Sequence, residues 1–137
     1  MARKAKRAAI DRAQAASYLG KAEEFLRSAE RAAAASDHDA AMLNAIHAAI
    51  SATDAVTVSL AGVRSTDPDH QRAADLLTEV AGASRQVEAQ ARQLRELLSR
   101  KNAVEYESRR ARASESVDAL KRASRLVAWA RGVVTGS

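Results

Sequence analysis

Apolar residues recur along most of the chain at alternating steps of three and four positions, the spacing that places them on one face of an α-helix. The first such face is formed by Ala15, Leu19, Ala22, Leu26, Ala29 and Ala33. The second is formed by Met42, Ala45, Ala49, Ala52 and Val56. The two patterns predict helices over residues 8–35 and 39–63, with Ser36 or Asp37 as the N-cap of the second.

Two shorter apolar patterns follow in the middle of the chain. A third helix is predicted over residues 68–81, with Asp67 as its N-cap and Pro68 at its first position. Gly82 permits a break or a kink. The fourth helix, over residues 84–99, therefore either stands alone or continues the third.

The segment 100–113 loses the apolar period and is dense in charge, which indicates a loop, with or without a short helical turn. Ser114 is a suitable N-cap for a last helix, whose apolar face ends at Val134. Taken together, the patterns predict an all-α, up-and-down bundle of four to five helices.

Composition supports this fold class and adds little beyond it. The chain has one proline, five glycines and only 3% aromatic residues, which favours long helices over a sheet. A length of 137 residues fits one domain, and we expect residues 1–7 and 135–137 to fray.

The net charge and the absence of cysteine limit the kinds of binding and catalytic site that the chain can form. The net charge of +5 permits attraction to nucleic acid, although both signs of charge are mixed along the helices. Without cysteine there is no disulfide, thiolate metal site or cysteine nucleophile. No secretory signal or stretch of about 20 apolar residues is evident, so we expect a cytoplasmic protein without a membrane partner.

A polar stripe interrupts the predicted second helix. Its members are Asn44, His47, Ser51 and Asp54, spaced three, four and three apart, which places them on one side of the helix. Such a stripe either lines a site in the bundle or satisfies its own hydrogen bonds inside the fold.

A second group of polar residues follows the fourth predicted helix. Arg100, Lys101 and Asn102 combine two cations with an amide, a combination suited to phosphate. Tyr106 comes four residues later and is able to stack on a base. The alternative is a structural loop in which Tyr106 anchors the segment to the core.

Other chemistries find no support in the sequence. No Glu is followed by His three residues later, and the three histidines, at 38, 47 and 70, have no metal-ligand spacing. There is also no phosphate-binding glycine loop and no nucleophile elbow. We therefore expect no metal and no cofactor.

The order and spacing of these segments resemble the HEPN superfamily, small helical bundles of prokaryotic toxin–antitoxin and nucleotidyltransferase-linked proteins. The resemblance spans residues 15–134 and rests on segments 18–26, 44–55, 69–77 and 100–106. The last of these resembles the family element of Arg-Asn followed some three residues later by His or Tyr.

The resemblance implies a metal-independent ribonuclease whose Arg and His act on RNA across a dimer interface. Here Arg100 or Lys101 matches the Arg, Asn102 matches the polar residue, and Tyr106 occupies the place of the His. No histidine follows Arg100 in the chain. Because tyrosine is a poor proton shuttle at neutral pH, this departure argues against catalysis, unless His47 or His70 supplies the imidazole.

Three hypotheses follow for function. The leading one is a non-catalytic, HEPN-like homodimer that binds RNA, a nucleotide or a co-encoded protein through residues 100–106 and the stripe on the second helix. The second is a divergent ribonuclease toxin. The third is a structural, antitoxin-like or scaffold subunit that ignores RNA.

Overall fold

The protein is described by a computed structural model that covers residues 6–136. Its helices are α1 (Ala15–Ala34), α2 (His38–Ala61), α3 (Gln71–Ala81), α4 (Arg85–Leu98), the short α5 (Lys101–Tyr106) and α6 (Ala113–Thr135). A 3-10 turn, η1 (Arg12–Gln14), precedes α1. Strands β1 (Arg7–Ala9) and β2 (Val63–Ser65) form an antiparallel pair.

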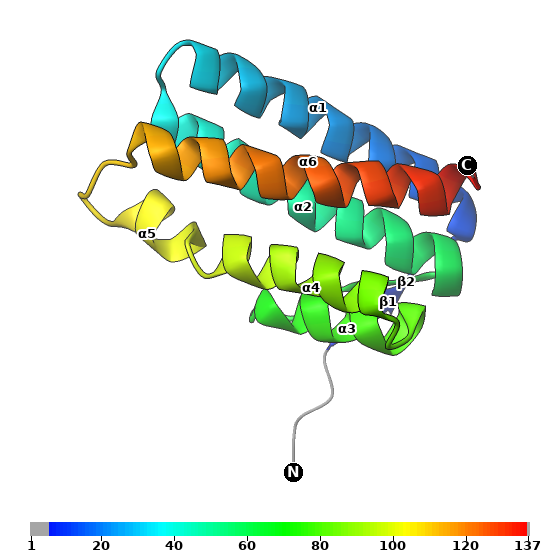
Figure 1. The fold of residues 1–137 in the computed structure, drawn as a ribbon. Coiled ribbons are helices and arrows are strands. Elements are labelled where there is room, and N and C mark those ends of the chain that lie inside the picture. Colours follow the sequence, from blue (N-terminus) through cyan, green and yellow to red (C-terminus); the bar gives the residue numbers. More distant parts are fainter. Residues whose placement is uncertain (1–5, 137) are drawn as a thin grey trace.

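Helix α2 lies at the centre of the bundle. It packs against α1 and α6 on one side and against the α3–α4 hairpin on the other, while α5 crosses near its N-terminal half (Figure 1). Residues on nearly all sides of α2 are therefore buried, from Ala41 to Val58. This arrangement of five longer helices confirms the predicted helical bundle.

Small side chains make up much of the core between the long helices. Ala22 and Ala29 of α1 and Ala45, Ala49 and Ala52 of α2 are fully buried. Because a methyl group occupies little space, the helix axes approach closely and the backbones themselves contribute to packing. The predicted apolar face of the second helix is buried throughout, as the spacing indicated.

The β1–β2 pair was not predicted, and both strands overlap the ends of helices expected from sequence. Gly62 adopts φ +64° and ends α2, after which Val63 pairs with Ala9. Asp11 accepts a hydrogen bond from the Ala13 amide at 2.9 Å and so starts η1 well after residue 8. Arg7 is also paired, with Ser65, so the frayed end expected over residues 1–7 does not include it; residues 1–5 lie outside the described part.

The start of α3 also differs from the prediction. Pro68 is not its first residue, because α3 begins at Gln71. The Asp67 carboxylate instead accepts hydrogen bonds from the amides of Asp69 at 2.9 Å and Lys6 at 3.1 Å. Asp67 thus holds the turn and the N-terminal segment together rather than capping a helix.

The open question of the third and fourth helices is settled by Gly82. Its φ of +90° breaks the chain direction, and α3 and α4 form a hairpin. Ser84, the first residue of the predicted fourth helix, is the N-cap of α4, since its hydroxyl accepts from the Val87 amide at 3.2 Å.

The last helix begins one residue before the predicted cap. Arg112 occupies the N-cap position, and the Glu115 carboxylate accepts a hydrogen bond from the Arg112 amide at 2.9 Å. Ser114 is therefore inside the helix. At the other end the helix continues through Thr135 and Gly136 caps it; Ser137 lies outside the described residues.

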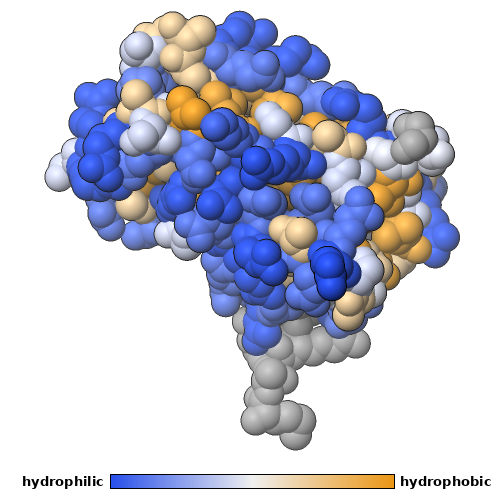
Figure 2. Space-filling model, viewed as in Figure 1, coloured by the Kyte–Doolittle hydropathy of each residue, from blue (hydrophilic) through white to orange (hydrophobic). Residues whose placement is uncertain are grey.

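The face of the molecule in Figure 2 is mainly hydrophilic, with apolar residues gathered in small areas, one of them beside the C-terminal ends of α2 and α6. Within residues 6–136, none of the helices is both long enough and apolar enough to cross a bilayer.

Candidate functional site

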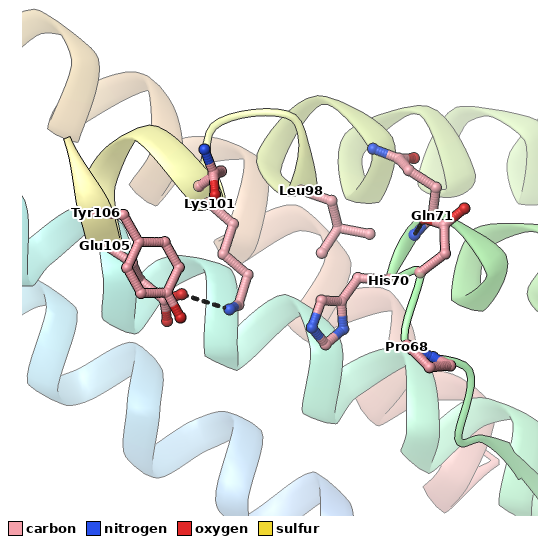
Figure 3. Close-up of a pocket in the computed structure, with 9 residues that line it drawn as sticks. Pro68, His70, Gln71, Leu98, Lys101, Glu105 and Tyr106 are labelled. Carbon is pink, nitrogen blue, oxygen red and sulfur yellow. Dashed lines mark hydrogen bonds and ion pairs between the residues drawn. The ribbon is translucent and has the colours of Figure 1, made fainter.

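A cavity of about 350 Å³ opens between α5 and the start of α3. We call it the α5 pocket, and its walls are Pro68, Asp69, His70, Gln71, Leu98, Lys101, Asn102, Glu105 and Tyr106. Figure 3 shows Lys101, Glu105 and Tyr106 on one side of it and His70 across from Lys101. The cavity therefore joins the charged segment after α4 to a histidine that lies well before it in the chain.

Helix α5 positions four polar side chains on the pocket side. Lys101 and Glu105 are four residues apart, as are Asn102 and Tyr106, so each pair is stacked on one side of the helix, and all four line the cavity. Lys101 Nζ and Glu105 Oε2 form an ion pair at 2.8 Å, which supports this short helix. The Lys101 hydrogen bond lowers the pKa of Glu105, so Glu105 stays ionised at neutral pH.

Tyr106 does not anchor the segment to the core. It is 78% exposed and lies at the mouth of the α5 pocket. The structural role that we considered for Tyr106 is therefore wrong for this conformation, and its ring is available to a ligand.

Arg100 faces away from the α5 pocket. Its guanidinium donates to Glu96 and to Asp118 of α6, both at 2.8 Å, and it lines a smaller cavity of about 230 Å³. Of the four residues predicted in this segment, the structure thus brings together Lys101, Asn102 and Tyr106 and separates Arg100 from them.

The residues of the polar stripe on α2 do not all have the same role: some form hydrogen bonds inside the fold and others lie near a cavity. Asn44 donates to the Ala40 carbonyl at 3.0 Å, a bond inside its own helix. The ring of His47 is half-buried and lies 5.5 Å from that of Phe25. Burial, followed by the positive charge of Lys101, lowers the pKa of His47, although Glu105 opposes the shift. His47 is therefore a neutral imidazole at neutral pH, within electrostatic range of Lys101 and Glu105.

Asp54, at the other end of the stripe, faces a second cavity of about 310 Å³. We call this cavity the Arg64 pocket, and its walls are Ile50, Asp54, Arg64, Ser65, Thr66, Asp67, His70 and Ala73. Asp54 Oδ2 lies 3.5 Å from Arg64 Nε. Burial raises the pKa of Asp54 to about 6, against the opposing charges of Arg64 and Lys21. Ser51, between the two ends, is half-buried and lines neither cavity.

The family model of the HEPN domain matches residues 15–133, which is most of the chain. The chain belongs to the HEPN domain family. This confirms the resemblance stated from sequence and agrees with the helical fold. Among curated proteins, none matches this chain.

In this HEPN domain, the fold decides the places of two further residues, His70 and Arg64. The sequence offered His70 as a possible source of an imidazole, and the structure shows that His70 lines both cavities. Arg64 was not singled out from sequence; it belongs to β2, and its Nε lies 3.5 Å from Asp54 Oδ2. No sequence motif places Arg64 near residues 101–106, so only the fold reveals it.

The HEPN domain site offers hydrogen-bond donors and acceptors side by side. Lys101, Asn102 and Gln71 donate, and Glu105 and Asp69 accept around the same cavity. Within residues 6–136, no three histidine or acidic side chains are grouped in a way that holds a metal ion. The arrangement suits a polar, planar ligand that carries both kinds of group.

Proposed function

We propose that this HEPN domain protein is a non-catalytic, homodimeric module that binds a nucleotide, either free or as part of RNA, in the α5 pocket. The observation that carries the proposal is the exposed ring of Tyr106 at the mouth of a cavity lined by Lys101 and Asn102. Aromatic rings that stack on bases beside a cationic group are a common way to bind single-stranded nucleic acid.

The charges of the α5 pocket are consistent with a base and a phosphate together. Lys101 is paired with Glu105, so a phosphate would share Lys101 with that carboxylate. Glu105 and Asp69 accept hydrogen bonds, as the amino groups of nucleobases require. The net charge of +5 adds a general attraction to polyanions.

A divergent ribonuclease is the second candidate, and one observation favours it. The α5 pocket contains His70, and His47 lies within electrostatic reach of Lys101 and Glu105. A neutral imidazole is a suitable general base at neutral pH, and Lys101 would stabilise negative charge on phosphate. The imidazole missing after Arg100 would then come from α2 or from the turn before α3.

The proposal is tested by titrating the protein with nucleoside monophosphates and short single-stranded RNA at fixed ionic strength. Replacing Tyr106 with Ala should weaken binding roughly tenfold or more, because stacking on one base contributes about 1–3 kcal/mol. Tyr106→Phe keeps the ring and should retain most of the affinity. Lys101→Met should weaken binding and reduce its dependence on salt.

Two control variants separate the pocket from general charge. Arg100→Gln removes a cation that faces the other cavity, and Lys121→Gln removes an exposed cation on α6. Both should leave nucleotide affinity close to that of the wild type. Equal affinities for wild type and Tyr106→Ala would contradict the binding proposal and favour the structural, antitoxin-like subunit.

The same samples decide whether the protein cuts RNA. Mixed structured and single-stranded RNA is incubated with wild type in the presence of EDTA, alongside the variants His70→Gln and His47→Gln. Intact RNA in every lane is the expected result. Cleavage by wild type that is lost in His70→Gln would replace the non-catalytic proposal with the ribonuclease.

A further inference from the structure

The Arg64 pocket contains a charged pair, Arg64 and Asp54, of which one partner is nearly buried. The side chain of Arg64 is 35% exposed and that of Asp54 only 8%, and the closest of their atoms are 3.5 Å apart. Arg64 Nε is itself buried, and no acceptor among residues 6–136 forms a hydrogen bond with it. The nearest acceptor is Asp54 Oδ2 in the ion pair itself, so the exposed part of the Arg64 side chain, rather than Nε, is what a ligand in the cavity meets.

Neighbouring side chains fix the position of the guanidinium. Its central carbon lies 5.8 Å from the centre of the Tyr18 ring. Lys21 Nζ lies 5.9 Å from the same ring, and both are cation–π distances. Arg64 also belongs to β2, where it pairs with Ala8 of β1. The donor is therefore held in place by two contacts that do not involve a ligand.

The chemistry of this pocket defines what it accepts. Arg64 offers planar N–H donors, and Asp54 beside it offers carboxylate oxygens. A ligand that satisfies both carries an acceptor and a donor on one edge. Nucleobases have such edges, whereas a phosphate would be repelled by Asp54 and by Asp67 in the same wall.

The two pockets are connected through the segment before α3. His70 lines both: it stands in one wall with Lys101 and Tyr106 and in the other with Asp54 and Arg64. Two bases bound in the two cavities would therefore lie on either side of His70 and apart from each other, as in single-stranded recognition.

We infer that the Arg64 pocket is a second nucleobase subsite, so that the smallest ligand to fill the groove is a dinucleotide with its first base on Tyr106 and its second between Arg64 and Asp54. This inference rests on the proposed function of the α5 pocket. To that function it adds a specific ligand length, two nucleotides, and a second point of contact with a base.

The test compares a monophosphate with a dinucleotide of the same base, for example AMP with ApA and UMP with UpU, by calorimetry at one ionic strength. Wild type should bind the better dinucleotide roughly tenfold more tightly than its monophosphate, a gain typical of one additional base contact. Arg64→Gln should abolish this gain and leave monophosphate affinity unchanged. Arg92→Gln, which removes an exposed arginine of α4 outside both pockets, should retain the gain.

The outcomes separate this inference from the function on which it rests. Suppose that monophosphates bind in a way that depends on Tyr106, but that no dinucleotide binds more tightly than its monophosphate. This result would overturn the second subsite alone. A gain that persists in Arg64→Gln would also overturn it. Absence of binding for all ligands would overturn the proposed function and the subsite together. Arg64→Lys keeps the positive charge at this position and is the control for misfolding. Circular dichroism checks that each variant is helical.

Discussion

At the scale of single residues, Asp54 is a nearly buried carboxylate whose pKa is raised. It lies in the central helix, where burial raises its pKa to about 6 from an ordinary value of 3.8. Arg64 and Lys21 reduce this shift without cancelling it. The folded protein therefore binds a proton at Asp54 more tightly than the unfolded chain does.

We predict that Asp54 makes the protein less stable as pH rises. With its folded pKa above the unfolded one, its contribution is most favourable below about pH 4 and is lost as pH rises through 6. A shift of this size corresponds to about 2–3 kcal/mol at neutral pH. Asp54→Asn should therefore flatten the pH dependence of the free energy of unfolding between pH 4 and 7, measured by urea denaturation.

Asp75 provides a control of opposite sign. Its hydrogen bond from Arg95 lowers the pKa of Asp75, so its contribution is present above the ordinary pKa and is lost in acid. Asp75→Asn should leave the slope between pH 5 and 7 unchanged. A difference in the free energy of unfolding between wild type and Asp54→Asn that stays constant from pH 4 to 7 would show that Asp54 is not held in this way; the comparison with the variant is needed because His47, whose pKa is lowered, contributes a slope of opposite sign.

At the scale of elements, the junction between α2 and β2 decides where the Arg64 pocket forms. Gly62 has φ +64°, and a Cβ at this position would lie 3.1 Å from the Ile10 carbonyl oxygen. The Ile10 amide donates to the Gly62 carbonyl at 2.8 Å, so the N-terminal segment approaches this residue closely. Both observations explain why glycine is needed there.

We predict that Gly62→Ala destabilises the protein by about 1–2 kcal/mol, because alanine is strained at positive φ. The added methyl group would also contact the Ile10 carbonyl. Gly20→Ala is the matched control, since Gly20 lies inside α1 with open space around the position of a Cβ. This change should stabilise by roughly 0.5–1 kcal/mol. Thermal unfolding of both variants gives the comparison, and equal effects would contradict the explanation.

At the scale of the whole molecule, the proposed function includes self-association into a homodimer. Leu60 and Val117 are 42% and 48% exposed, although they are large and apolar. Burial of such side chains against a second copy would remove apolar surface from water. Leu60 lies near the C-terminal end of α2 and Val117 near the N-terminal end of α6, at opposite ends of these helices (Figure 1), so each marks a separate candidate contact for the homodimer expected from the family resemblance.

We predict that light scattering at high protein concentration shows twice the mass of one chain. The double variant Leu60→Glu and Val117→Glu should shift the population to monomer, while the exposed pair Lys121→Gln and Arg92→Gln should not. Only monomer at high concentration would remove the homodimer from the proposal and leave nucleotide binding by a single chain.

The sequence by itself indicated the long helices and the family, but not where α1 and α3 begin. The three–four spacing of apolar residues in α1, α2 and α6 survives in the structure because amphipathic periodicity is a local property of consecutive residues. Ser84 and Gly82 likewise act through their own backbone and nearest neighbours. The HEPN resemblance, carried by the order of these segments, is confirmed by the family match over residues 15–133.

Only the tertiary structure decided which polar residues share a site. Arg100 and Lys101 are adjacent in sequence, yet Arg100 forms ion pairs with Glu96 and Asp118 while Lys101 lines the α5 pocket, because Arg100 is the N-cap residue between α4 and α5 and Lys101 is the first residue of α5. His70 and Arg64 enter the two pockets from a turn and from a strand. That strand pairs with a segment near the start of the chain, and local periodicity contains no information about such distant contacts.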